Sequence, residues 1–333
     1  MASILESIAS QFGPDVVDKL GSALGTSPGA VNKGLGALGP LLLNGMSSLA
    51  NTPTGADTLM KALPQDSGGL GSLLGGIFGG SSSSALGGGI VQSLLGPGIN
   101  TVSASISRAL GFNVAPLMQL ALPAALGAVS KLVKDNGLSA TSIGPALAAE
   151  KQVFLDNPAH AESAALVRSA LDAGDKAAAK IQGYGAEWSQ VRAAPAAALM
   201  LVATSDLSGP LGTIKEVQAA SKAMADAARA APDPASVIGA AFGSGVDAEL
   251  LKLVRELAPS QDKLIDIVKA GASAVATRDP AQSAAYKSTL LAVAQATAEA
   301  AKEGGIFGIG GTLVSQDEQA AIDQLKAALT ESF

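Results

Sequence analysis

Apolar residues recur at helical spacing along most of the chain, and no segment alternates in the way typical of a β-strand. Near position 250, four apolar residues follow the i, i+3, i+4, i+7 spacing of a helix that buries one face: Leu250, Leu253, Val254 and Leu257. Helix starts are marked by a capping residue followed by proline, at Asn157-Pro158, Asp233-Pro234 and Asp279-Pro280. The pattern predicts an all-α fold.

The first half of the chain contains an internal repeat. One copy covers about residues 3–67 and the other about residues 90–148, while residues 68–89 have the composition of a flexible linker. In each copy a glycine ends one helix and a later proline starts an apolar one, which predicts a bundle of short helices. The corresponding stops are Gly25 and Gly111. Thr26-Ser27-Pro28 marks the next helix start in the first copy, and Pro40 and Pro123 are expected to begin the later apolar helices.

The most apolar stretch, residues 114–133, has the length of a membrane-spanning helix but contains Pro116 and Pro123. A span needs about 20 predominantly apolar residues. We therefore expect a buried helical hairpin here and no membrane span.

Charge separates the two halves. Residues 1–148 carry six acidic and six basic side chains, so the net charge of −6 belongs to residues 149–333. Glycine has the opposite bias, with 25 of the 39 glycines before residue 149. We therefore predict two helical domains, a duplicated glycine-rich domain in 1–148 and an acidic, alanine-rich bundle of longer helices in 149–333.

The composition also restricts the chemistry. The chain has no cysteine, which excludes disulfides, thiolate nucleophiles and cysteine-based metal sites, and its one histidine excludes multi-histidine metal sites. An acidic pI near 4.9 disfavours binding to nucleic acid. Residues 1–7 lack the basic and apolar regions of a secretory signal, so we expect a cytoplasmic protein.

The repeated unit, a helix ending in Ala-Leu-Gly, a turn, and an apolar helix that contains proline and glycine, resembles the bacterial family called domain of unknown function 937 (DUF937), which includes the YidB-like proteins. The resemblance covers residues 3–148 and is clearest at 107–131. It implies a helical domain and brings no catalytic residues.

The second half, residues 190–333, is similar to TerB-like helical domains through 198–216 and 291–329. In that group, acidic residues beside a loop can hold a divalent cation, so the resemblance implies a cation site at Glu303, Asp317 and Glu318 around the loop 304–311. Further acidic candidates are Glu299, Asp206 and Glu216.

Glycine-rich strings allow two interpretations. The string 34–39 matches G-x-G-x-x-G, but it lies within a helical pattern and runs into Pro40, so close helix packing is favoured over dinucleotide binding. The loop 304–311 has no lysine in the phosphate-binding position, which favours an apolar contact. The residues expected to make such contacts, in this loop and in the linker, are Gly304, Ile306, Phe307, Ile309, Gly311, Ile77 and Phe78.

The sequence therefore predicts a non-enzymatic protein without a cofactor, which binds a protein partner or copies of itself. The alternative is a module in the second half that binds a divalent cation or a small ligand. The single histidine, His160, is expected at the surface in a first helical turn, and Tyr184 and Trp188 are expected in the core or at a domain interface.

Overall fold

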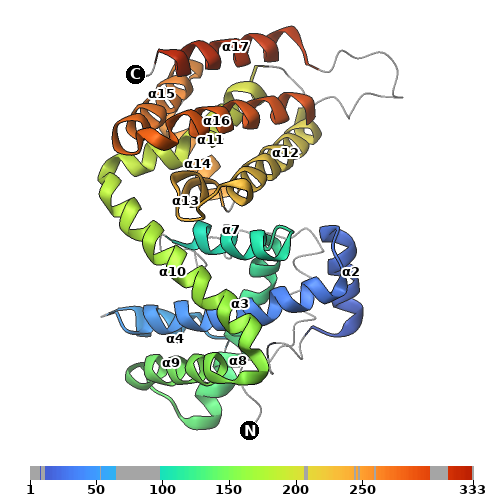
Figure 1. Cartoon of the computed structure of the whole chain (residues 1–333), viewed down its shortest axis with the longest axis vertical. Helices are drawn as coiled ribbons and strands as arrows, with labels where there is room; N and C mark the ends of the chain where they lie inside the picture. The colour runs from blue at the N-terminus through green and yellow to red at the C-terminus, as the bar shows by residue number, and fades with distance from the viewer. Residues whose placement is uncertain are drawn as a thin grey trace. The chain divides into compact units, whose positions relative to one another are not determined.

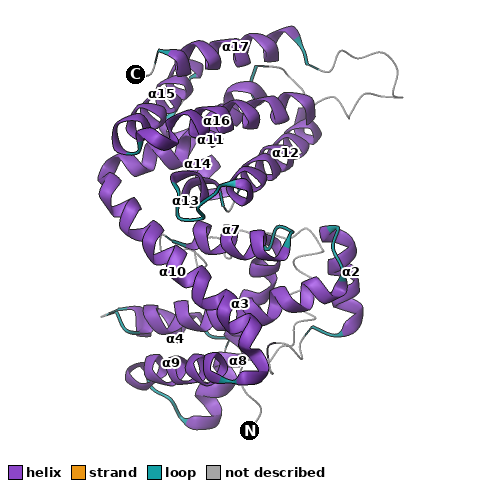
Figure 2. Cartoon of the chain, in the orientation of Figure 1, coloured by secondary structure: helices purple, strands orange, loops and turns teal. Residues whose placement is uncertain are grey.

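The computed structural model contains only helices as regular elements among the residues it describes (Figure 1 and Figure 2), which confirms the all-α prediction. Those residues are 8, 12–52, 54–64, 98–205, 209–243, 245–246, 248–258, 260–300 and 314–331. The α-helices are α2 (Pro14–Leu24), α3 (Pro28–Ala50), α4 (Gly55–Ala62), α7 (Ile99–Leu110), α8 (Ala115–Asn136), α9 (Ala140–Asp156), α10 (Ala161–Tyr184), α11 (Trp188–Ala203), α12 (Gly209–Ala230), α13 (Val237–Phe242), α14 (Ala248–Leu257), α15 (Gln261–Arg278), α16 (Pro280–Ala300) and α17 (Gln316–Thr330). Two 3-10 turns, η1 (Pro158–His160) and η2 (Gly185–Glu187), flank α10.

The chain forms two compact units, Met1–Ala173 and Gly174–Phe333. The boundary between them lies inside α10, whereas the change in composition near residue 148 lies inside α9. Burial accounts for the difference, because Val167 and Ala170 at the start of α10 are fully buried in the hydrophobic core of the first unit. Both α9 and the first turns of α10 therefore complete the first unit.

The first unit shows the same order of elements twice. A helix ends at a left-handed glycine, a long helix follows, and a third helix comes after it, as α2–α3–α4 and again as α7–α8–α9. The predicted stops are confirmed: Gly25 has φ of 64° and Gly111 has φ of 79°, in the region where glycine avoids the strain of other residues.

The two prolines expected to start helices instead lie within them. Pro40 is inside α3 and Pro123 is inside α8, so the helix starts expected at these two prolines and the hairpin expected in 114–133 are wrong, whereas the start expected at Pro28 is confirmed. An internal proline costs about 3 kcal/mol. Burial of one leucine contributes about 1.5–3 kcal/mol, and α3 alone fully buries Leu38 and Leu41. Tertiary packing therefore outweighs the local penalty.

α3 lies at the centre of the first unit and contacts α2, α4, α7, α8 and α9. Glycines let its neighbours approach closely. A Cβ atom at Gly34 would lie 3.0 Å from Leu117 Cδ1, and one at Gly144 of α9 would lie 2.7 Å from Asn51 Oδ1. The glycine string 34–39 thus serves helix packing inside α3, as predicted.

α11 has the same central place in the second unit, where it packs most extensively on α15 and also contacts α12, α14, α16 and α17. Small residues bring α11 and α15 together. A Cβ atom at Gly271 of α15 would lie 2.9 Å from both the Gln190 carbonyl oxygen and Ala194 Cβ. The alanine richness of the second half therefore produces closely spaced helices.

One helix in the described part of the chain, α8, is long and apolar enough to cross a membrane by length and composition alone. Of its most apolar 18-residue window, 65% is buried within the protein. A core helix passes the same test, so the expectation of no membrane span is left as a prediction.

Candidate functional site

Several residues singled out from the sequence lie outside the described part of the chain. These are Asp206, Glu303, the loop residues Gly304, Ile306, Phe307, Ile309 and Gly311, and the linker residues Ile77 and Phe78. Their contacts stay predictions.

Asp317 and Glu318 lie in the first turn of α17, where Glu318 forms a capping box with Ser315. The Ser315 amide donates to Glu318 Oε2 at 2.7 Å, and the Glu318 amide donates to Ser315 Oγ at 3.2 Å. Glu318 is only 2% exposed, so its carboxylate satisfies the helix start instead of facing solvent. Asp317 is exposed beside it.

The remaining acidic candidates lie on two different helices. Glu216 of α12 is 1% exposed, whereas Glu299 of α16 is exposed. Within the described ranges, no group of three or more His, Cys, Asp or Glu side chains could hold a metal ion. The cation site stays a prediction, because Glu303 belongs to the residues that are not described.

The histidine and the large aromatic residues take structural positions. His160 lies exposed in η1 and stacks on Phe154, with ring centroids 4.7 Å apart. Tyr286 is fully buried and stacks on Phe242 at 5.4 Å, and buried Tyr184 contacts Trp188 at 5.5 Å. Burial raises the pKa of Tyr184 to about 12 and that of Tyr286 well above its usual value. The two tyrosines are therefore core residues in their neutral form.

The hydroxyl of Tyr286 has a specific structural task. It donates a hydrogen bond of 2.6 Å to the carbonyl oxygen of Val191 in α11. That carbonyl would ordinarily accept from the amide four residues later, but residue 195 is proline and has no N–H. Tyr286 therefore supplies the donor that Pro195 lacks.

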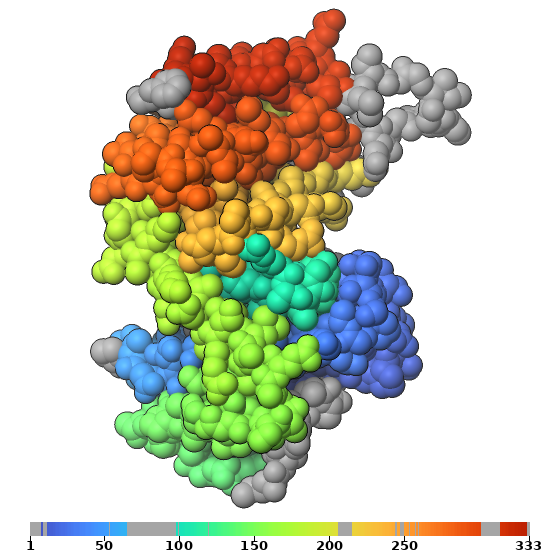
Figure 3. All heavy atoms as spheres, viewed as in Figure 1, coloured from blue at the N-terminus to red at the C-terminus, as the bar shows by residue number. Residues whose placement is uncertain are grey.

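The described surface of the second unit has an open groove of about 580 Å³ between α12 and α16. In the space-filling view the two helices form neighbouring bands of the surface (Figure 3). The groove is lined by Lys215, Gln218, Ala219, Lys222, Ala223 and Asp226 of α12, and by Ala296, Glu299 and Ala300 of α16.

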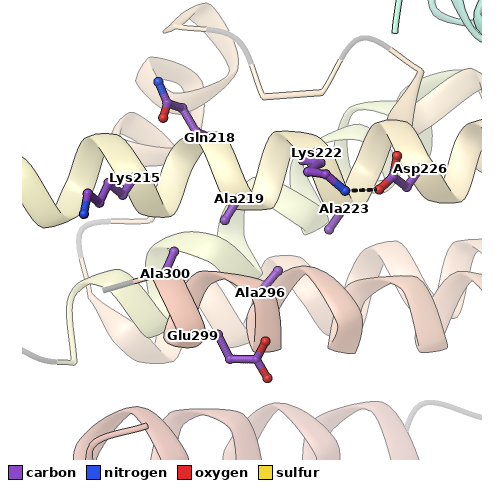
Figure 4. A pocket seen from close by; sticks show the side chains of 9 residues that line it. All are labelled: Lys215, Gln218, Ala219, Lys222, Ala223, Asp226, Ala296, Glu299 and Ala300. Atoms are coloured by element: carbon purple, nitrogen blue, oxygen red, sulfur yellow. Dashed lines mark hydrogen bonds and ion pairs between the residues drawn. The ribbon is translucent and has the colours of Figure 1, made fainter. Parts of the chain in front are cut away.

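Alanines form the floor of this groove. Ala219 and Ala223 point from α12 toward α16, and Ala296 and Ala300 point back toward α12 (Figure 4). The longer polar side chains, such as Gln218 and Glu299, extend away from this floor at the two walls (Figure 4). The polar groups therefore do not converge on one point, as catalytic groups would.

The charges on the walls are partly paired within their own helix. Lys222 Nζ lies 2.7 Å from Asp226 Oδ2, and Arg229 also binds Asp226. On the opposite wall, Gln295 Nε2 donates to Glu299 Oε1 at 2.9 Å. No carboxylate of the described chain forms an ion pair with Lys215. Among the described contacts, one wall thus presents a lysine without an ion pair and the other an exposed carboxylate.

A pattern of large apolar residues in the sequence does not indicate this groove, because alanine, the smallest apolar side chain, forms its floor. The detectable signal is a pair of alanines at i and i+4 on each helix, Ala219 with Ala223 and Ala296 with Ala300. Residues at this spacing share one face of a helix. That two such faces adjoin depends on the fold.

Residues 6–134 match the family described as "Bacterial protein of unknown function (DUF937)". The match runs from before α2 almost to the end of α8 and confirms the resemblance seen in the repeat. No curated protein and no solved structure matches the chain. The similarity of residues 190–333 to TerB-like domains stays a prediction.

Proposed function

Since residues 6–134 carry a DUF937 segment, whose function is unknown, we propose a role for the chain from its own geometry: a non-enzymatic protein that self-assembles through contacts between helices. The groove between α12 and α16 carries this proposal. It is open, its floor is alanine, and its polar side chains stand apart on the walls. Such a surface suits a helix, whereas a small-molecule site is typically concave with converging polar groups.

The charge distribution supports contact between copies. Six acidic and six basic side chains over residues 1–148 leave the first half neutral. Low net charge weakens the electrostatic repulsion that keeps molecules apart and so promotes association. Copies of this chain therefore meet little repulsion from their first halves.

Light scattering coupled to size-exclusion chromatography tests the proposal on the full chain over a series of concentrations. We expect a mass that rises with concentration from the 32.6 kDa of one chain toward a multiple of it. A mass of one chain at every concentration would contradict self-assembly.

A further inference from the structure

We infer that the groove between α12 and α16 is a two-fold interface, in which α12 of one copy lies over α16 of a second copy. The inference rests on the proposed self-assembly and adds where the copies meet and by which symmetry. Two-fold dimers are the commonest soluble assemblies, and their interface uses the same patch on both subunits. The groove has the two properties that such a patch needs, a floor that permits close approach and walls of complementary charge.

The floor permits close approach of another helix. Ala219, Ala223, Ala296 and Ala300 have no atoms beyond Cβ, and they lie together between α12 and α16 (Figure 4). Packed helices have axes about 8–10 Å apart, and the smaller value requires small side chains at the contact. The volume of about 580 Å³ above the alanines is therefore space that side chains of a second copy can fill.

The walls are complementary under one rotation. α12 and α16 run in opposite directions along the groove, with Lys215 toward one end of its wall and Glu299 near the middle of the opposite wall (Figure 4). A two-fold axis along the groove exchanges the walls without reversing the direction of the groove. Lys215 of each copy then faces the Glu299 wall of the other, where the long lysine and glutamate side chains can reach each other as two equivalent ion pairs.

The other charges on the groove do not compete for these pairings. Lys222 and Asp226 bind each other within α12 at 2.7 Å, and Arg229 adds a second cation to Asp226. Glu299 receives only a neutral amide donor, from Gln295, in the described contacts. Lys215 and Glu299 are therefore the charges on this surface that a second copy can neutralise.

Two charge reversals, alone and mixed, test the inference. Lys215→Glu places a carboxylate against Glu299 of an identical copy, and Glu299→Lys places two ammonium groups together, so each variant alone is expected to associate at least about tenfold more weakly. When the two variants are mixed, both contacts again join opposite charges. Sedimentation velocity should then show a heterodimer with the affinity of the unmodified chain.

Lys263→Glu is the matched control, because it makes the same charge change at an exposed position on α15 that does not line the groove. Circular dichroism melting of each variant verifies that it is folded. Restored association in the mixture supports the inference. Suppose that the unmodified chain self-associates but the reversals leave the affinity unchanged, or that the mixture fails to restore the affinity. The interface then lies elsewhere and the inference is overturned, while self-assembly stands. An unmodified chain that stays monomeric overturns both.

Discussion

At the residue scale, the hydrogen bond between Tyr286 and Val191 explains how α11 tolerates Pro195 in its interior. The helix loses one backbone bond at this point, and a buried carbonyl without a donor costs about 1–3 kcal/mol. The Tyr286 hydroxyl removes that cost by donating at 2.6 Å. The sequence did not indicate this pairing, because Val191 and Tyr286 meet only after α11 and α16 have packed.

We expect Tyr286→Phe to lower the free energy of unfolding by about 1–3 kcal/mol, because the Val191 carbonyl is left buried without its donor. In a Pro195→Ala background the alanine amide can donate to the same carbonyl, so Tyr286→Phe should cost clearly less there. Urea denaturation of the four proteins in this cycle measures both values. Equal losses in the two backgrounds would show that the tyrosine does not compensate for the proline.

At the element scale, the apolar periodicity identified the helices, glycine identified their ends, and proline correctly marked the starts of α3 and α16. The breaks expected at two other prolines are wrong. Pro40 and Pro123 lie inside helices because burial around them exceeds the local penalty. The candidate groove was missed for a related reason. Ala219 and Ala223 contribute little to an apolar pattern, and their importance depends on which helix lies beside them.

Two glycine substitutions separate helix propensity from helix packing. Gly271→Ala should destabilise the protein by about 1–3 kcal/mol, since the added Cβ would lie 2.9 Å from the Gln190 carbonyl oxygen and force α11 and α15 apart. Gly127→Ala in α8 is the matched control, because nothing lies within 4 Å of the position that its added methyl group would take, and alanine favours helix by about 1 kcal/mol. Thermal melting compares them. Stabilisation by both substitutions would contradict the close contact between α11 and α15.

At the scale of the whole molecule, composition indicates two parts, but contacts place their boundary differently. Composition changes near residue 148 because charge and glycine content change there. The first compact unit nevertheless continues to Ala173, since it uses α9 in full and the start of α10. Lys151 Nζ donates to Asn44 Oδ1 of α3 at 2.8 Å, which joins residues on opposite sides of the change in composition. Average composition cannot detect such a contact.

This difference predicts how fragments behave. A fragment of residues 1–173 should unfold in one cooperative transition, because it retains Phe154, Val167 and Ala170 in the buried interior. A fragment of residues 1–148 lacks these side chains and ends in the middle of α9. Apolar surface of the first core is then exposed to water, and each large side chain that is no longer buried costs about 1.5–3 kcal/mol of stability. It should melt at lower temperature or without a sharp transition, as circular dichroism and limited proteolysis can show. Equal stability of the two fragments would place the boundary at the change in composition, because α9 and α10 would then add nothing to the first core.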